Sequence, residues 1–351
     1  MTSVSGYPRR LSTLRLTMRA PSEADRPLWV RLHRDPTLYR HEPYAISPSE
    51  AAASAQFDGV LAHWADRGFG YHIVERTAEP AEPVGVGGLR AEGDAELNLY
   101  YRFVAAAQGQ GYAREAARAW VAAGVEHLEG TVVAVAKEHN LASVRTALAA
   151  GLGRAGTRKD PQDPVGTAPS VLLRAPRAEV VRAEGFTRAT RRDVLDLWCR
   201  VTASGGAVGF LPSEPREAHA EALAAHEEQM RAGRATAVLL RDPDTPGDPA
   251  VAGLGWWVQE PVTLLAHRRT AYRVMTDPDR RGRNLGRILM AAMHRAAREE
   301  GVELVTLGVR GGMGLEGFYE RCGYREVGRV PGGIRVALGD DRDDVTMARR
   351  L

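Results

Sequence analysis

Two short stretches, Gln108-Gly-Gln-Gly-Tyr-Ala113 and Arg281-Gly-Arg-Asn-Leu-Gly286, decide the fold of this 351-residue chain. Each follows an apolar, strand-like segment and opens an amphipathic helix, which extends to about Ala123 in the first case and about Glu300 in the second. The small residues in each stretch indicate a tight connection from a strand to a helix. The chain therefore contains one kind of connection twice, with 173 residues between Gln108 and Arg281.

The segments that follow the two stretches also match each other. From Gln108 to the glycine at 151 there are 43 residues, and from Arg281 to the glycine at 323 there are 42. Each interval contains a helix, a short apolar strand (131–135 and 304–309) and a second helix. A long period with matched internal spacing indicates two copies of one domain rather than a solenoid. We therefore predict an α/β (α+β) chain of two tandem domains, each a mixed central sheet flanked by helices.

The boundary between the copies is expected within 174–179, which gives domains 1–177 and 178–351. The first copy opens on a strand at 14–20, and the matching strand of the second copy is predicted at 185–189. Further predicted elements are a last strand of the first copy at 170–173 and, in the second copy, a helix at 215–232, strands at 236–240, 250–258 and 272–275, and a loop at 242–248.

Composition excludes several classes of protein. The net charge is only +3, and arginine alternates with acidic residues, whereas a nucleic-acid-binding protein concentrates positive charge on one face. Cys199 and Cys322 form no CxxC pattern, so neither a metal site nor a disulfide framework is expected. No apolar run reaches the roughly 20 residues of a membrane span, and residues 1–19 lack the apolar region of a signal peptide. We expect a cytoplasmic protein without a membrane or nucleic-acid partner.

The two Gly-rich stretches are suited to binding an anion. The first turn of a helix has N–H groups without an intrahelical partner, and the helix dipole adds positive potential there. Small residues let a diphosphate approach the backbone. The sequence has no GxxxxGK[ST] motif, so a P-loop nucleotide site is not supported.

Each copy carries three groups of residues in the same order. They are 97–103, 108–113 and 140–143 in the first copy, and 272–278, 281–286 and 318–324 in the second. With these groups the chain resembles the GCN5-related N-acetyltransferase (GNAT) superfamily over nearly its whole length. The first copy is similar to the branch that contains ribosomal-protein acetyltransferases, and the second is similar to the general acetyltransferase branch.

The resemblance implies acetyl-CoA, or another acyl-CoA, with its pyrophosphate on each Gly-rich turn and its thioester between the fourth and fifth strands of the domain. In the first copy the implied cofactor-binding residues are Phe103, Gln108, Gly109, Gln110, Gly111, Tyr112, Ala113, Asn140 and Ser143. In the second copy they are Val274, Met275, Thr276, Arg281, Gly282, Arg283, Asn284, Leu285, Gly286 and Arg287. Asn140 is also placed to cap the helix that follows it.

The copies differ where the family has its proton donor. Tyr319 stands four residues before Gly323, whereas Ala147 stands four residues before Gly151. A tyrosine, with a pKa of about 10, can protonate the departing CoA thiolate, so Tyr319 is the expected catalytic residue. Asn284 replaces the glycine that is usual in the turn, and asparagine tolerates left-handed backbone geometry better than most residues.

The general base is left open by the sequence. Candidates are His267, Glu260 and Glu316 in the second copy and Glu96, Asn98 and Tyr101 in the first. Strand alternation places Trp256 and Trp257 on opposite faces of one strand. We expect one of them to pack in the core and the other to face away, where it could line an acceptor or interdomain surface.

Three hypotheses follow. The first is an N-acetyltransferase acting on a small-molecule amine, with the chemistry in the C-terminal domain. In the second, the N-terminal domain acetylates a peptide or protein amine. The third is a non-catalytic acyl-CoA-binding module. The resemblance implies that acceptor choice comes from the first two helices and the variable loops, such as 40–49 and 204–215, and neither of these loops carries a chemical signature. The tandem copies are expected to form a monomeric pseudo-dimer or a homodimer.

Overall fold

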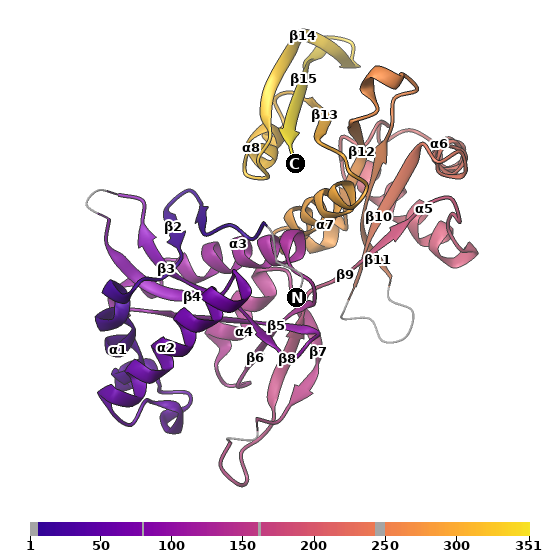
Figure 1. Cartoon of the computed structure of the whole chain (residues 1–351). Coiled ribbons are helices and arrows are strands. Elements are labelled where there is room, and N and C mark those ends of the chain that lie inside the picture. Colours follow the sequence, from indigo (N-terminus) through magenta and orange to yellow (C-terminus); the bar gives the residue numbers. More distant parts are fainter. Residues whose placement is uncertain (1–5, 79–80, 161–162, 243–249) are drawn as a thin grey trace. The chain divides into compact units, whose positions relative to one another are not determined.

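The computed structural model describes residues 6–78, 81–160, 163–242 and 250–351. The chain forms two compact units, Met1–Ala175 and Pro176–Leu351 (Figure 1). Apart from Asp242, the loop predicted at 242–248 lies outside the described residues. We refer to the two units as the N-terminal and C-terminal domains.

The N-terminal domain alternates strands and helices. Its elements are β1 (Arg10–Ser12), β2 (Leu16–Arg19), α1 (Arg26–Arg34), α2 (Glu50–Arg67), β3 (Tyr71–Arg76), β4 (Pro83–Glu92), β5 (Glu96–Phe103), α3 (Tyr112–His127), β6 (Thr131–Ala136), α4 (Leu141–Ala149), β7 (Gly153–Arg158) and β8 (Ser170–Arg174). The described residues form an eight-stranded mixed sheet in the order β1-β2-β3-β4-β5-β6-β8-β7.

The C-terminal domain repeats this sequence of elements without the short β1. Its elements are β9 (Arg177–Val181), α5 (Arg188–Ala203), α6 (Arg216–Arg231), β10 (Ala235–Arg241), β11 (Val251–Val258), β12 (Arg268–Thr276), α7 (Leu285–Glu299), β13 (Leu304–Arg310), α8 (Leu315–Glu320), β14 (Arg325–Ala337) and β15 (Asp340–Arg350). The described strands are ordered β9-β10-β11-β12-β13-β15-β14. This is the order of β2 to β7 in the first sheet, which confirms the predicted duplication of one mixed α/β fold.

One predicted strand is wrong. Residues 185–187 form an irregular segment and residues 188–189 begin α5, and the first strand of the C-terminal domain is β9. The hydroxyl of Thr187 accepts a hydrogen bond from the backbone N–H of Thr190 at 3.1 Å, so Thr187 is the N-cap of α5. Gly185 has a φ of 69°, a left-handed turn conformation that ends any extended segment there.

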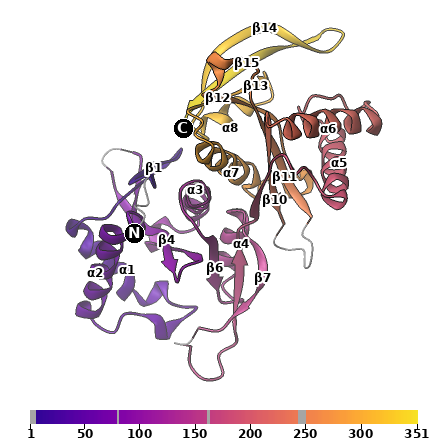
Figure 2. The same ribbon diagram turned by 45° about the vertical axis from the view of Figure 1, so that its right-hand side comes forward.

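Helices cover both faces of the C-terminal sheet. Strands β10 and β11 lie between α5 and α6 on one side and α7 on the other (Figures 1 and 2). Trp256 stacks on His226 of α6, with ring centroids 4.5 Å apart, and Trp257 donates its indole N–H to the carbonyl oxygen of Met293 in α7 at 2.7 Å. Both indoles are 0% exposed. The two side chains do alternate, but the expectation that one faces away from the core is wrong because α7 covers the second face.

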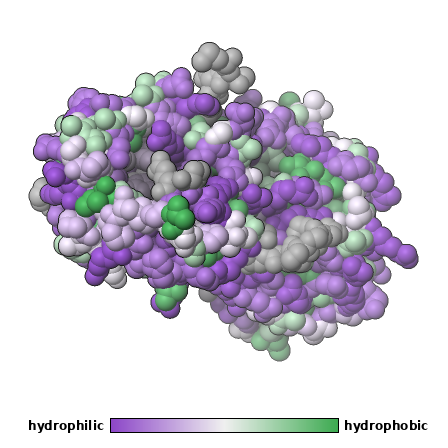
Figure 3. All heavy atoms as spheres, turned by 90° about the horizontal axis from the view of Figure 1, so that it is seen from below, coloured by the Kyte–Doolittle hydropathy of each residue, from purple (hydrophilic) through white to green (hydrophobic). Residues whose placement is uncertain are grey.

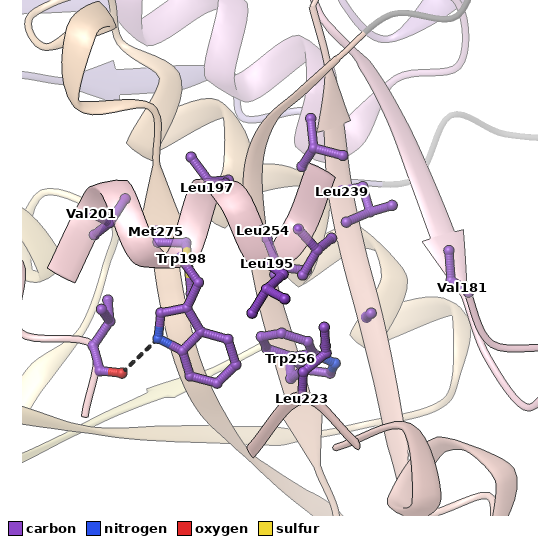
Figure 4. Packing of buried hydrophobic residues seen from close by; sticks show 14 of the residues in the cluster. Val181, Leu195, Leu197, Trp198, Val201, Leu223, Leu239, Leu254, Trp256 and Met275 are labelled. Atoms are coloured by element: carbon purple, nitrogen blue, oxygen red, sulfur yellow. Dashed lines mark hydrogen bonds between the residues drawn. The ribbon is translucent and has the colours of Figure 1, made fainter. Parts of the chain in front are cut away.

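The α5–α6 face encloses the apolar core shown in Figure 4. Trp198, Leu254, Trp256 and Met275 meet there from α5, β11 and β12. The indole N–H of Trp198 donates to the carbonyl oxygen of Val208 at 3.2 Å, which is the dashed bond in the figure. This bond attaches the loop that follows α5 to the core of the domain.

The surface is mixed. On the face seen in Figure 3, hydrophilic residues predominate and hydrophobic residues occur in small separate groups. Among the described residues, no helix combines the length and apolar character of a membrane span.

Candidate functional site

The two Gly-rich turns have the same backbone geometry. Gly111, the N-cap of α3, has φ 79° and ψ 6°, and Asn284, the N-cap of α7, has φ 63° and ψ 3°. Two residues earlier, Gly109 and Gly282 have φ values of 76° and 80°. Asn284 therefore adopts the left-handed conformation of the glycine that it replaces, a geometry that asparagine tolerates better than most residues. In both domains the helix begins at the residue after this cap.

The turns leave their backbone open to a ligand. A Cβ placed on Gly109 or Gly282 would have no atom within 4 Å. The first-turn N–H groups of α3 and α7 are the donors that such a site supplies. A diphosphate therefore fits both turns, with backbone N–H groups as its partners.

The glutamine side chains of the first turn support the loop itself. Gln108 donates from its amide nitrogen to the carbonyl oxygen of Phe103 at 3.2 Å, and Gln110 donates to that of Ala106 at 2.8 Å. In the second turn, Arg281 donates to the hydroxyl of Ser204 at 3.1 Å. These side-chain hydrogen bonds hold each turn in place.

An ion pair borders the first turn. The guanidinium of Arg15 lies 2.7 Å from the carboxylate of Glu115 and donates to the carbonyl oxygen of Gln110 at 3.0 Å. It also lies 4.7 Å from the ring centroid of Tyr112. Burial acts to raise the pKa of the Glu115 carboxyl, but hydrogen bonds from Thr13 and Arg15 outweigh it and hold that pKa below its usual value.

The two central parallel strands of each sheet separate along their length. In the N-terminal domain β5 and β6 pair only over Glu96–Asn98, and in the C-terminal domain β12 and β13 pair only over Arg268–Ala271. Beyond these residues the ladder ends, although β5 continues to Phe103 and β12 to Thr276. We call these unpaired segments the open halves of β5 and β12. They lie between the fourth and fifth strands of the shared fold, where the sequence placed the thioester.

The open half of β12 is irregular, unlike that of β5. The register of β12 against β11 shifts between Leu254 and Trp256, and Arg273 has a φ of 52°. The β4–β5 pairing is continuous over the whole of β5. The bulge therefore distinguishes the C-terminal domain at the point where a thioester is expected.

Tyr319 lies on α8, next to the second turn. The ring of its neighbour Phe318 comes within 3.1 Å of the position that a Cβ on Gly286 would take, so α8 packs against the first turn of α7. The Tyr319 ring lies 5.0 Å from that of Phe318 and 5.7 Å from that of Tyr324. Burial raises the pKa of the Tyr319 phenol well above its usual value, so the hydroxyl keeps its proton at neutral pH.

The corresponding position of the N-terminal domain has no acid. Ala147 on α4 is 1% exposed and packs in the core. Asn140 accepts a hydrogen bond from the backbone N–H of Ser143 at 3.1 Å, which confirms it as the N-cap of α4. The hydroxyl of Tyr101 lies 3.2 Å from that of Ser143, and burial raises the pKa of Tyr101. The structure thus brings Tyr101 and Ser143 together at the open half of β5.

Two candidates for the general base lie at the wrong end of their strands. Glu96 begins β5 at its paired end, where its carboxylate accepts hydrogen bonds from Arg158 at 2.5 Å and Arg174 at 3.1 Å. His267 directly precedes the paired end of β12. At about 3.3 Å per residue, it lies roughly 23 Å along the strand from Val274. Neither side chain is placed to take a proton at the open half.

Charged residues that the sequence did not indicate join the loops at one end of the N-terminal sheet. The ammonium of Lys137, at the end of β6, lies 2.7 Å from the carboxylate of Asp163, and the hydroxyl of Tyr44 donates to the same carboxylate at 2.7 Å. Hydrogen bonds from Lys137 and Tyr44 hold the pKa of the Asp163 carboxyl below its usual value. His139 also contacts the carbonyl oxygen of His41 at 3.1 Å. We call Lys137, Asp163, Tyr44 and the His139–His41 contact the loop clasp.

The only sequence signal for the loop clasp is a lysine at the end of an apolar strand, in a chain with just two lysines. Its partner Asp163 lies 26 residues away, on the loop between β7 and β8. In the described parts of the chain, no three His, Cys, Asp or Glu side chains are grouped so that they could hold a metal ion.

Comparison with known proteins agrees with this geometry. The family model of the GNAT acetyltransferase domain matches residues 15–152, and a second model of the same domain type matches residues 249–326. The chain belongs to the GNAT acetyltransferase family. It carries two GNAT domains in tandem.

Solved structures similar to this GNAT chain each cover about half of it. A protein described as a GNAT-family acetyltransferase from Bordetella pertussis is 22% identical, with a TM-score of 0.41, over 48% of this chain and 99% of that one. A ribosomal-protein-alanine N-acetyltransferase from Brucella melitensis is 18% identical, with a TM-score of 0.40, over 49% and 99%. An acetyltransferase from Agrobacterium tumefaciens is 26% identical, with a TM-score of 0.40, over 48% and 94%. No curated protein matches the chain.

Proposed function

We propose that this protein is an acetyl-CoA-dependent N-acetyltransferase that acetylates a primary amine of a small molecule, with the chemistry in the C-terminal domain. The observation that carries the proposal is Tyr319, a partly buried phenol with a raised pKa on a helix packed against the α7 turn, set against Ala147 in the N-terminal domain. The two GNAT domains support the reaction class. The acceptor and the active domain are part of the proposal.

Both turns suit acetyl-CoA. The N–H groups at the start of α3 and α7, with open space at Gly109 and Gly282, fit its pyrophosphate. When bound, acetyl-CoA supplies an activated acetyl group as a thioester. The open half of β12 would hold that group, with strand N–H groups polarising its carbonyl.

In the C-terminal domain, the neutral acceptor amine attacks the acetyl carbonyl carbon directly. The N–C bond forms as the C–S bond breaks. The hydroxyl of Tyr319 donates its proton to the departing sulfur, and the proton lost by the amine passes to water. Because burial keeps Tyr319 protonated, no prior ionisation step is needed for it to act as the acid.

The N-terminal domain would bind acyl-CoA and act as a structural or weakly active partner. It lacks the tyrosine, and the loop clasp ties loop 40–49 to the end of β6 and to the β7–β8 loop. Loop 40–49 is where an acceptor is expected to bind. Opening it would require breaking the Tyr44–Asp163 hydrogen bond of 2.7 Å and separating Lys137 from Glu42, which lie 3.8 Å apart.

The test is release of free CoA thiol from acetyl-CoA with a panel of small amines. We expect Tyr319→Phe to lower kcat by about 10²-fold or more, the usual contribution of a general acid. Tyr324→Phe is the matched control, because it removes the hydrogen bond that the nearby buried hydroxyl shares with Nε2 of His294 without removing the proposed acid. Its kcat is expected to stay close to that of the wild type.

Gly111→Trp tells the activity of one domain from that of the other, because the tryptophan fills the N-terminal turn and leaves the C-terminal turn unchanged. If Tyr319→Phe retains full turnover while Gly111→Trp abolishes it, acetylation belongs to the N-terminal domain and the assignment to Tyr319 is wrong. Calorimetric binding of CoA without turnover of any amine or peptide would point to a non-catalytic acyl-CoA-binding module.

A further inference from the structure

Arg273 lies beside the expected reaction centre of the C-terminal domain. It stands two residues beyond the last β12–β13 pair and one residue before Val274, in the irregular segment of β12. Its φ of 52° is a conformation that arginine rarely adopts. Such backbone strain at a site persists only where the surroundings hold it.

The side chain of Arg273 is held on the α5–α6 face of the sheet. Its guanidinium carbon lies 5.4 Å from the ring centroid of Trp198 and 5.5 Å from that of Phe210. Its Nη1 donates to the carbonyl oxygen of Val208 at 2.9 Å. A Cβ on Gly209 would lie 1.1 Å from that nitrogen, so loop 204–215 fits around the guanidinium only because residue 209 is glycine.

The charge of Arg273 is not balanced by the protein. No carboxylate in the described parts of the chain forms an ion pair with it, and its buried Nε has no hydrogen-bond partner there. Its Nη2 donates to no described residue, and Arg273 as a whole is only partly buried. Neighbouring His226 supplies no negative charge, and burial together with Arg273 lowers the pKa of that histidine to about 4. An unpaired cation in such surroundings favours an anionic ligand.

That ligand is not the cofactor diphosphate. The diphosphate-binding turn at Gly282 precedes α7, which packs on the Trp257 face of the sheet. Arg273 contacts Trp198 of α5, on the opposite face, and is wrapped by loop 204–215. This is the loop in which acceptor choice is expected. A planar guanidinium matches a carboxylate better than a single point charge does.

We propose that Arg273 binds a carboxylate of the acceptor, so that the C-terminal domain acetylates amines that also carry a carboxylate, such as amino acids. This inference rests on the proposed function and adds the substrate class to it. The carboxylate contacts Nη2 of Arg273, and the amine of the same acceptor faces the open half of β12.

The test compares each L-amino acid with its α-amide as the acceptor, by release of CoA thiol. The wild type is expected to prefer the carboxylate form by about 10- to 100-fold in kcat/KM, the usual range for a hydrogen bond to a charged group. Arg273→Met is expected to remove this preference by raising KM for the acids, with the amides unchanged. The methionine occupies the same strained φ, so the variant adds no new backbone cost.

Two further variants separate ligand binding from structure. Gly209→Ala displaces the guanidinium without removing it, and it is expected to reduce the preference in the same direction. Arg269→Met is the matched control on the paired half of β12, where the Arg269 side chain donates to the carbonyl oxygens of Ala266 and Arg268. It is expected to keep the wild-type preference. The proposal is overturned if the wild type and Arg273→Met prefer the carboxylate form equally. It is also overturned if the wild type has no preference for the carboxylate form, even when amines are turned over rapidly.

A binding measurement tells the two proposals apart. N-acetylated amino acids and their amides are titrated into the wild type and Arg273→Met by calorimetry. Carboxylate-dependent binding that Arg273→Met abolishes, without turnover of any amine, upholds the carboxylate site and refutes the acetyltransferase assignment. Binding that does not depend on the carboxylate refutes the site. The acetyltransferase assignment is then tested by the Tyr319→Phe experiment alone.

Discussion

The same substitution, glycine to alanine, is expected to have opposite effects at two positions of the N-terminal domain. Gly111 has a φ of 79°, and its added Cβ would meet only Nη2 of Arg15 at 3.6 Å, an ordinary contact. The change therefore tests the backbone alone. A left-handed conformation costs alanine about 1–2 kcal/mol, and the stiffer unfolded chain offsets about 0.4–1 of this. We expect Gly111→Ala to lower the free energy of unfolding by about 1 kcal/mol.

Gly59 lies inside α2, and its added Cβ would meet no atom within 4 Å. Alanine is favoured over glycine in a helix interior by about 1 kcal/mol, so Gly59→Ala is expected to raise the free energy of unfolding by about that amount. The two variants should differ by about 2 kcal/mol. For a domain of this size, that difference corresponds to about 4–8 °C in Tm.

The assay is a urea titration in which unfolding is monitored by hydrogen exchange. Mass spectrometry reads the exchange in peptides from α2 and α3. A single bulk signal would mix the transitions of the two domains. Shifts of the same sign for Gly111→Ala and Gly59→Ala would refute the reasoning, because it predicts a loss at the left-handed cap and a gain in the helix interior. CoA binding measured on the same samples shows whether the turn keeps its function.

Three shorter predictions concern the C-terminal domain. Burial lowers the pKa of His226 from 6.5 to about 4. As the pH falls from about 6.5 towards 4, the unfolded state therefore binds a proton that the folded state does not, and the free energy of unfolding decreases. His226→Phe keeps a ring stacked on Trp256 but has no group to protonate. We expect the decrease in the free energy of unfolding over this pH range to be smaller by up to about 3 kcal/mol, as measured by urea titrations. Trp257→Phe is expected to cost about 1 kcal/mol more than Trp256→Phe in the same assay, because Trp257 donates to Met293 whereas the buried Nε1 of Trp256 has no partner among the described residues. Equal losses would contradict this. Since burial raises the pKa of Tyr319, we expect no decline of kcat from its ionisation up to about pH 10, and a decline that Tyr319→Phe abolishes would show that the phenol titrates earlier.

The duplication and the two turns could be predicted from the sequence because their causes are local. A strand, a small-residue turn and an amphipathic helix follow one another within a few residues, so α3 and α7 begin where the sequence placed them. The tolerance of asparagine for left-handed geometry, noted from the sequence, agrees with the φ of 63° at Asn284. Asn140 was likewise recognised as a helix cap from its position alone.

What the sequence could not predict depends on contacts between distant elements. Alternation placed Trp256 and Trp257 on opposite faces correctly, but nothing in the strand itself shows that α7 covers the second face. The strand predicted at 185–189 was wrong because Thr187 already caps α5 there. The loop clasp joins segments up to 119 residues apart. Arg273 acquires its role from a bulge and from loop 204–215, neither of which has a periodic signature.

The equal torsions at Gly111 and Asn284 bear on how further domains of this kind are recognised. A pattern that requires glycine at the helix cap would count the second turn as lost, although its backbone superimposes in φ and ψ to within about 16°. The property that both turns share is the ability to hold φ between 63° and 79°, and two different side chains satisfy it. Searches for degenerate copies should therefore score a torsional requirement at this position, admitting asparagine beside glycine, rather than the identity of a single letter.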